Sequence, residues 1–188
     1  VIAEYDFYYN DDEADDQHGH GTFVAGIVSG TGQASNYKFV GLAPKSTLLI
    51  GKVGPDDAKG SDVSSLSKGI EWAIKNDVDI ISISSAYREH KILEDMMKFA
   101  LNQNIVLVMG AGNDGTFQSI QSPRNAEDLM IVGATDNNDK LAEFSSKGPD
   151  TEFKVKPDIV APGVGICTPK SKKNMFSRHK LTCDNDNY

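Results

Sequence analysis

Residues 78–113, VDIISISSAYREHKILEDMMKFALNQNIVLVMGAGN, contain the pattern that decides the fold. Residues 78–83 and 105–109 are nearly continuous β-branched or apolar runs of strand length. Between them, residues 89–103 repeat apolar side chains at three- and four-residue spacing, which predicts a helix with one apolar face. That face is predicted to consist of Ile92, Leu93, Met96, Met97 and Ala100. Because apolar runs of this kind are typical of strands covered on both faces, the segment predicts two parallel strands joined by a helix.

The same alternation continues on both sides of this segment. Residues 47–53 and 130–134 are further apolar runs of strand length, and residues 21–30 are small and apolar at helical spacing. A helix is also predicted over residues 62–76, with Asp62 as its N-cap. Strands that alternate with helices predict an α/β fold with right-handed crossovers. In such folds sites gather beyond the carboxyl ends of the strands, so the loops after Ile83 and Met109 are the first candidates.

Composition narrows the class of protein. A chain of 188 residues is long enough for one domain with its own core, and its net charge of −8 argues against non-specific binding to nucleic acid. No apolar stretch reaches the length needed to cross a bilayer. The two cysteines allow one disulfide and do not have the spacing of zinc ligands.

The most specific motif is His18-Gly19-His20-Gly21-Thr22-Phe23-Val24-Ala25-Gly26. It resembles the histidine signature H-G-T-x-V-A-G of the subtilases, the subtilisin-like serine proteases. The register of the match falls on His20 and not on His18. The resemblance implies that His20 is a general base that takes the proton of a serine hydroxyl and then returns it to the leaving amine.

A second motif, Met109-Gly110-Ala111-Gly112-Asn113-Asp114-Gly115-Thr116, follows a predicted strand. It resembles the A-A-G-N-x-G segment of the subtilases. The resemblance implies that the Asn113 side chain donates a hydrogen bond to the oxyanion of the transition state. By itself the segment is better explained by an asparagine that serves only a tight turn beside two glycines. Its place 93 residues after the His20 motif, in the chain order of the family, favours the oxyanion role instead.

Two further segments resemble the family's substrate-binding edges. The tripeptide Ser84-Ser85-Ala86 stands where the family has Ser-Leu-Gly or a similar sequence, which pairs with the substrate backbone. Gly110, Ala111 and Gly112 are expected to form the facing wall of the specificity pocket. Gly60 and Ser61 match the other edge, although ordinary strand-end turns would also account for these two residues.

Shorter strings extend the resemblance from about residue 16 to residue 168. They are Val40-Gly41-Leu42-Ala43-Pro44, Phe144-Ser145-Ser146-Lys147-Gly148-Pro149 and Lys156-Pro157-Asp158-Ile159-Val160-Ala161-Pro162-Gly163. We therefore expect residues 1–168 to be part of a subtilase catalytic domain. Residues 169–188 are polar, basic and then acidic, and are expected to be a surface loop or frayed end. The implied fold has three layers, with a mainly parallel sheet between helices, and is incomplete at both ends.

Two members of the family's aspartate-histidine-serine triad have no match in the chain. Asp6 does not lie in the D-[ST]-G turn of the family, and neither Ser171 nor Ser177 lies in a G-T-S-M-A string. We expect the aspartate to precede Val1 and the serine to follow the end of the chain. The alternative is a homologue in which the serine or the aspartate is substituted and which acts as a peptide-binding or regulatory module.

Metal chemistry is the weaker alternative. His18 and His20, two residues apart, could bind a metal together with Asp15 or Asp16, but no further ligand set is evident. Calcium often stabilises members of the family, and the carboxylates of Asp11, Asp12, Asp15 and Asp16 offer oxygen ligands. An acidic loop is more often simply solvated, so the sequence assigns no metal site. The expected function needs no cofactor and acts on polypeptides, outside the cell or at its surface. The sequence does not indicate an oligomeric state.

Overall fold

The computed structural model describes residues 1–57, 60–85, 90–120, 128–150 and 153–171. The chain divides into two compact units. Unit 1 comprises Val1–Lys59 and Cys167–Tyr188, and unit 2 comprises Gly60–Ile166. The described part of unit 1 is therefore residues 1–57 and 167–171.

Unit 1 contains a two-stranded parallel sheet. Strand β1 (Ala3–Asp6) pairs with β2 (Leu49–Lys52) in a register that places Asp6 opposite Lys52. Between the two strands the chain forms helix α1 (His20–Ser29) and the short 3₁₀ helix η1 (Gln33–Ser35). Facing residues of parallel strands point to the same side of a sheet, so this register brings the Asp6 carboxylate to the Lys52 ammonium group.

The segment from Cys167 to Ser171 packs on helix α1 within the same unit. A Cβ atom added to Gly26, in the middle of α1, would lie 2.3 Å from Cδ of Pro169. The Ser171 hydroxyl donates a hydrogen bond to the backbone oxygen of Asp16. Cys167 is disulfide-bonded, and residues 172–188, the rest of the expected tail, lie outside the described residues.

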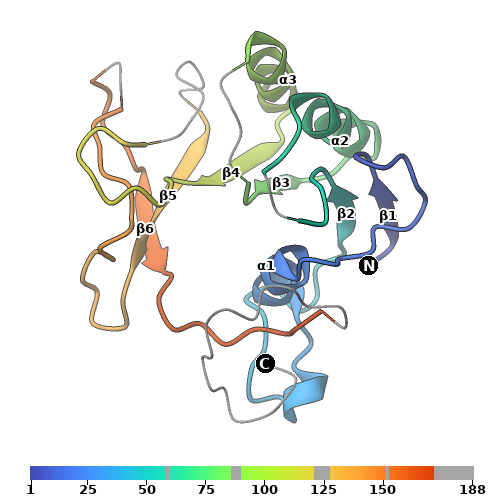
Figure 1. Ribbon diagram of the computed structural model, residues 1–188, viewed down its shortest axis with the longest axis horizontal. Coiled ribbons are helices and arrows are strands. Elements are labelled where there is room, and N and C mark those ends of the chain that lie inside the picture. The colour runs from blue at the N-terminus through green and yellow to red at the C-terminus, as the bar shows by residue number, and fades with distance from the viewer. Residues whose placement is uncertain (58–59, 86–89, 121–127, 151–152, 172–188) are drawn as a thin grey trace. The chain divides into compact units, whose positions relative to one another are not determined.

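Unit 2 is built on a four-stranded parallel sheet in the order β3-β4-β5-β6 (Figure 1). Its strands are β3 (Ile80–Ile83), β4 (Val106–Gly110), β5 (Met130–Thr135) and β6 (Ile159–Pro162). Ile83 faces Met109 across β3 and β4, so the residues after both strands leave the same edge of the sheet. That edge is the carboxyl edge at which the sequence predicts the site.

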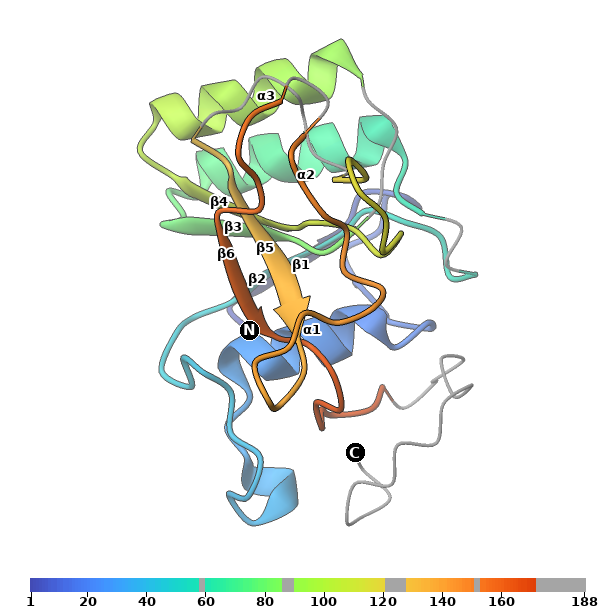
Figure 2. The same cartoon turned by 90° about the vertical axis from the view of Figure 1, so that its left-hand side faces the viewer.

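Two amphipathic helices cover one face of this sheet. Helix α2 (Val63–Lys75) begins after Asp62, whose carboxylate accepts the Ser65 amide as an N-cap. Helix α3 (Lys91–Asn102) begins after His90. Figure 2 shows both helices on the same side of the strands. The core of the unit includes Leu66, Ile70, Leu93, Met97, Ala100, Leu107, Met109 and Ile131.

The other face of the sheet carries apolar side chains that remain exposed in the described part of the chain. In β3, β4 and β5 they alternate with buried or partly buried residues, as the two-residue period of a strand requires, whereas β6 exposes both Ile159 and Val160. The largest are Ile80, Val106, Met130 and Ile159.

The predicted helices and central strands are confirmed to within a few residues, and Asp62 is confirmed as an N-cap. One member of the predicted apolar face of α3 is wrong, because Ile92 is 59% exposed. Ile92 lies about 100° around the helix from the buried row formed by Leu93, Met97 and Ala100, so its side chain points away from the core although Leu93 in the same turn is buried. Strands β1 and β6 are not among the strands predicted from the sequence. Strand β1 contains Glu4 and Asp6 and so is not an apolar run, and β6, although apolar, ends in Pro162, a residue uncommon in strands.

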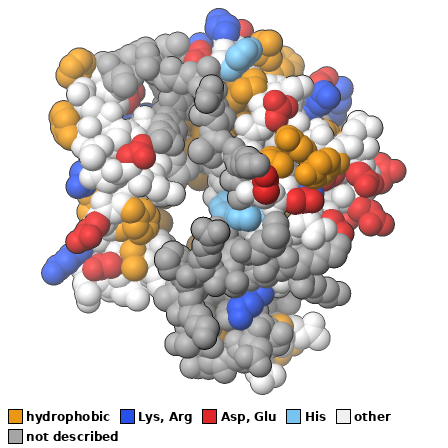
Figure 3. All heavy atoms as spheres, in the orientation of Figure 1, with side chains coloured by type: hydrophobic (Ala, Val, Ile, Leu, Met, Phe, Trp, Pro, Cys, Tyr) orange, Lys and Arg blue, Asp and Glu red, His pale blue; other side chains and the backbone are white. Residues whose placement is uncertain are grey.

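Acidic side chains gather on the surface over the loop that follows β1 (Figure 3). Asp11, Asp12, Glu13 and Asp15 of this loop are exposed. Among the described helices, none combines the length and the apolar character that crossing a bilayer would require.

Candidate active site

His20 is the first residue of helix α1, and its position depends on the glycine before it. Gly19 has φ 98°, a left-handed conformation that a residue with a Cβ atom rarely adopts. Gly19 is also buried, so the chain turns sharply into the helix at this point. The sequence motif therefore places an imidazole at the N-terminus of a helix, held by a turn that only glycine forms without strain.

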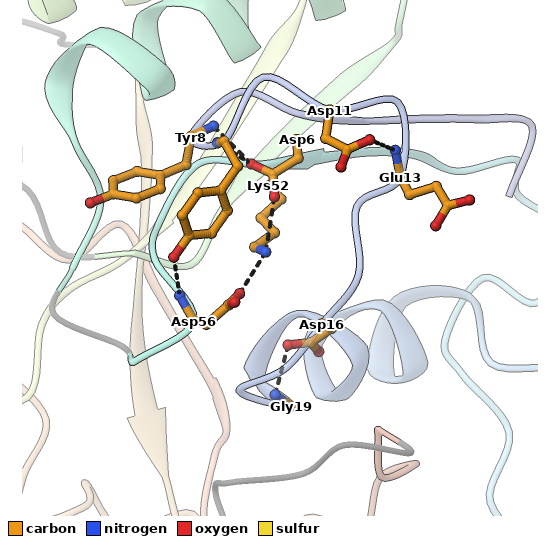
Figure 4. A network of polar contacts seen from close by, with 9 residues as sticks. Asp6, Tyr8, Asp11, Glu13, Asp16, Gly19, Lys52 and Asp56 are labelled. Carbon is orange, nitrogen blue, oxygen red and sulfur yellow. Dashed lines mark hydrogen bonds and ion pairs between the residues drawn. The ribbon is translucent and has the colours of Figure 1, made fainter.

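The helix N-terminus is satisfied by a side chain from outside the helix. The Asp16 carboxylate accepts the Gly19 amide through Oδ1 and the Thr22 amide through Oδ2, both at 2.7 Å. Figure 4 shows Asp16 beside the start of α1. This role was not identified from the sequence, which suggested Asp16 only as a source of metal ligands. The available signal was the position of an aspartate one turn before the predicted helix, where a cap can reach amide groups.

The surroundings of His20 favour its neutral form. Burial lowers the pKa of His20 below its ordinary value, the charge of His18 lowers it further, and the Asp16 carboxylate partly opposes both effects. The rings of His18 and His20 lie 6.3 Å apart, and the Phe23 ring lies 5.7 Å from that of His20. A neutral imidazole can accept a proton at neutral pH, which is the state that a general base requires.

Asn113 lies in unit 2, exposed, on a turn that directly follows β4. Gly112 before it has φ 108° and Gly115 after it has φ 66°. The turn is bound to a buried serine: the Ser146 amide donates to Gly112 O, and Ser146 Oγ accepts the Asp114 amide. Asn113 is therefore presented to solvent by a turn with fixed bonds on both sides.

The segment at residues 144–149, whose sequence resembles that of the family, holds the Asn113 turn in place through its two serines. Ser145 and Ser146 are each 1% exposed, and Ser145 Oγ accepts the Ala134 amide of β5 at 3.0 Å. A buried hydroxyl that satisfies a backbone amide costs far more to remove than an exposed one. Ser146 is thus bonded to the Asn113 turn and the adjacent Ser145 to strand β5, so the two serines connect the turn to the sheet.

The predicted substrate-binding residues of unit 2 come together at the carboxyl edge of the sheet. Ser84 and Ser85 follow β3, and residues 110–112 follow the adjacent strand β4. The Ser61 hydroxyl forms a hydrogen bond with the Ser85 hydroxyl, so the two predicted edges lie side by side. A Cβ atom added to Gly110 would meet nothing within 4 Å, whereas Ala111 is buried.

The remaining predicted site residues are distributed as follows. Gly60 has φ 93° and precedes Ser61 in the same edge, and Ala86 lies outside the described residues. His20 belongs to unit 1, whereas the other predicted site residues belong to unit 2. Within the described residues, no group of three or more histidine, cysteine, aspartate or glutamate side chains is placed to hold a metal ion.

Comparison with known proteins identifies related chains along almost the whole sequence. The profile described as the subtilase family matches residues 1–184. The chain is 35% identical over 152 residues to the minor extracellular protease Epr of Bacillus subtilis, covering 80% of this chain and 22% of that protein. It is 34% identical over 200 residues to the serine protease AprX of the same species, covering 95% of this chain and 45% of AprX. The chain thus spans less than half the length of these two relatives.

Solved structures give the same result for the fold. A cold-adapted subtilisin-like serine proteinase matches with a TM-score of 0.76 at 24% identity, over 92% of this chain and 59% of that one. The prenylagaramide maturation protease PagA matches with a TM-score of 0.71 at 26% identity, over 90% of this chain and 58% of PagA. These likenesses confirm the predicted α/β fold with its parallel strands.

Proposed function

The chain belongs to the subtilase family, and we propose that it forms part of a subtilisin-like serine endopeptidase in which His20 is the general base. The position of His20 carries the proposal. The imidazole stands at the N-terminus of α1, in the register of the family's histidine motif, and burial favours the neutral form that accepts a proton. A histidine that served only packing would need neither the left-handed glycine before it nor the bonded turn around it.

In the proposed reaction, the His20 imidazole removes the proton from a serine hydroxyl as its oxygen attacks a peptide carbonyl. The imidazolium then gives that proton to the leaving amine as the peptide C–N bond breaks, and the acyl group remains on the serine as an ester. Water attacks this ester with the same proton transfers, which releases the carboxylic acid and regenerates the serine. The D-[ST]-G and G-T-S-M-A strings of the other two triad members do not occur within the 188 residues. We assign the aspartate and the serine to no residue of this chain.

Asn113 is proposed to stabilise the negative charge that develops on the carbonyl oxygen. An amide donor that is held in place before the reaction loses no free energy to reorganisation when the charge appears. The bonds of Ser146 to the residues on both sides of Asn113 support this role. Such a mechanism requires no cofactor, and we propose none.

The proposed substrate is an extended polypeptide. Backbone groups at Ser84 and Ser85, together with Ser61 on the neighbouring edge, would pair with the substrate main chain as added strands. Main-chain pairing does not depend on side-chain identity, which suits an endopeptidase. Gly110, with open space where a side chain would stand, is proposed to line the specificity pocket with Ala111 and Gly112.

A fluorophosphonate probe tests the proposal on the full-length protein that contains these residues. We expect a serine to be labelled, and labelling to disappear in His20→Ala. His90→Ala is the matched control, because His90 lies at the start of α3 and has no role in the proposed reaction. The isolated 188-residue chain is not expected to be labelled. Absence of labelling in the folded, unaltered full-length protein contradicts the proposal.

An inactive homologue that binds peptides is the second candidate function. The observation in its favour is the absence of both triad strings from the 188 residues. It predicts that the full-length protein binds an extended peptide at the edge containing Ser84 and Ser85 but is not labelled by the probe. Labelling of a serine excludes it.

We also propose that the protein acts outside the cell. The support is the relative Epr, which is described as an extracellular protease. Fractionation of the source cells, followed by immunoblotting of medium and lysate, tests this proposal, which requires the protein in the medium or at the surface.

A further inference from the structure

Helix α1 has no cap of its own. The residue at its N-cap position is Gly19, which has no side chain to accept a backbone amide, and the first turn contains no acidic residue. A helix leaves its first amide groups without intrahelical partners, and its N-terminus carries a partial positive charge. The helix that carries His20 therefore depends on a group from elsewhere in the chain.

The Asp16 carboxylate is that group, and its two bonds lie on either side of His20. One oxygen accepts the amide of Gly19, immediately before the histidine, and the other accepts the amide of Thr22, two residues after it. The first bond fixes a glycine in the left-handed conformation, and the second fixes the first turn of the helix. With both amides held by one planar group, the backbone from which the imidazole projects has little freedom to rotate.

Asp16 is itself held in place and ionised. The Ser171 hydroxyl donates to the backbone oxygen of Asp16, and Pro169 packs against Gly26 in the middle of α1. Burial alone would raise the pKa of Asp16, but hydrogen bonds from Thr22 and Gly19 outweigh it and hold the pKa below its ordinary value. A negative charge thus stands at the positive end of the helix, beside the imidazole.

We propose that Asp16 is the positioning residue for His20, fixing the direction of the imidazole through Gly19 and Thr22 and placing a negative charge beside it. The inference rests on the proposed function, because it assigns Asp16 a part in the reaction of His20. Asp16 does not touch substrate in this role and is distinct from the triad aspartate. Both of its oxygens are bonded to amide groups, which also argues against the metal-ligand role considered for it from the sequence.

The charged groups that act on His20 are known, so a change in its titration can be attributed to a particular residue. Asp16 and His18 act on His20 from its own segment. Among the described residues of the segments that contact the helix, the charged ones are Lys45, between Gly41 and Ser46, and Lys170 beside Ser171, and both are exposed. The experiment therefore varies Asp16 and follows His18 and His20 separately.

The first experiment uses the 188-residue chain and needs no activity. Imidazole titration by NMR is followed in the unaltered chain, in Asp16→Asn and in Asp16→Ala, with Asp12→Asn as the matched control. Asp12 carries the same charge in the same acidic loop and is exposed. We expect both Asp16 variants to move the titration of His20 to lower pH, and amide exchange of Thr22 to rise by roughly fivefold, the equivalent of losing a helix cap. Asp12→Asn should do neither.

The second experiment measures peptide hydrolysis by the full-length protein. A misdirected general base lowers kcat, and we expect Asp16→Ala to reduce kcat by roughly 10- to 100-fold with KM little changed. Asp16→Asn, which keeps one acceptor oxygen, should recover part of kcat but leave the acid limb of the pH profile shifted to lower pH. A residue that merely stabilised the fold would lower Tm and leave kcat and the pH profile of the folded enzyme unchanged.

The two experiments separate failure of this inference from failure of the proposed function. If the unaltered full-length protein is inactive, the proposed function fails, and the NMR titration and Thr22 exchange still decide whether Asp16 positions His20. If His20 titrates in Asp16→Ala and Asp16→Asn as it does in Asp12→Asn, the inference is overturned. It is also overturned if kcat survives in Asp16→Ala.

Discussion

The Lys52 ammonium nitrogen lies 2.9 Å from Oδ2 of Asp6, a carboxylate whose side chain is 3% exposed. Oδ1 of the same carboxylate accepts the amides of Tyr8 and Tyr9, both at 2.9 Å, and Lys52 also contacts Asp56 (Figure 4). Asp6 is the last residue of β1 and Lys52 is the last residue of β2. The Asp6 carboxylate therefore connects the ends of both strands with the turn that follows β1.

Replacement of Asp6 should therefore destabilise unit 1. We expect Asp6→Ala to lower the free energy of unfolding by about 2–4 kcal/mol, because it leaves two backbone amides without their acceptor and removes one partner of a mostly buried lysine. Urea denaturation measures the change. Glu71→Gln, which breaks the exposed pair of Glu71 with Lys75, should cost no more than about 0.5 kcal/mol. Equal effects of the two substitutions would contradict the assignment of Asp6 as a structural residue.

Gly115 and Gly110 both flank the Asn113 turn, but we expect their replacement by alanine to have different effects on stability. Gly115 has φ 66°, and a Cβ atom there would stand 2.3 Å from the Glu143 backbone oxygen. We expect Gly115→Ala to cost at least about 2 kcal/mol of unfolding free energy, from the strained φ and the displaced backbone.

Gly110→Ala adds the same methyl group in open space and should change stability by less than about 1 kcal/mol. In the full-length protein it should nevertheless raise KM for a peptide substrate, because the methyl group would occupy the proposed specificity wall. Thermal unfolding and steady-state kinetics on the two alanine variants separate the two effects, and an unchanged KM would remove Gly110 from the proposed pocket.

Replacement of Asn113 tests the oxyanion role. Asn113→Ala in the full-length protein should lower kcat by about 10²–10³-fold with little change in KM, which is the range known for loss of the oxyanion asparagine in subtilisin itself. Asn113→Ala should leave the melting temperature nearly unchanged, since the side chain is exposed. Asn102→Ala, at the end of α3, is the control and should retain full activity. Retention of kcat in Asn113→Ala would leave this asparagine with a turn function alone.

Acidification should destabilise the chain in two steps. The folded-state pKa of His20 lies below the ordinary value of 6.5, so the unfolded chain takes up a proton before the folded chain does, and stability falls as the pH drops from about 6.5 toward the folded pKa. The Asp16 carboxylate, whose folded-state pKa lies below 3.8, contributes stability that is present above that value and is lost as the pH falls through the folded pKa.

Urea unfolding at about pH 7.5, 5.5, 4.5 and 2.5 measures both steps, the first between the two higher values and the second between the two lower ones. His20→Gln should remove the contribution of His20 to the first step and leave the second in place. A His20→Gln variant with the same pH dependence as the unaltered chain would show that burial does not shift the titration of His20.

The sequence by itself determined the elements whose stability is local. The periodic apolar residues of α2 and α3 fix which face of each helix is buried, Asp62 is recognisable as a cap from its neighbours alone, and the apolar runs of β4 and β5 have no other stable environment than a sheet. The same holds for the motif at His20, because a glycine before a helix start is a local requirement.

Only the tertiary structure decided the features that depend on residues far apart in the chain. Strand β1 has no clear apolar pattern of its own. It is stabilised by pairing with β2, in a register that brings Asp6 into an ion pair with Lys52. Ser146 could not be connected with the Asn113 turn from sequence spacing, nor Ser171 with Asp16. Hydrogen bonds and ion pairs need atoms within about 3 Å. Which distant residues meet that condition is fixed by how the packed elements fold back on one another, and not by the order of the residues.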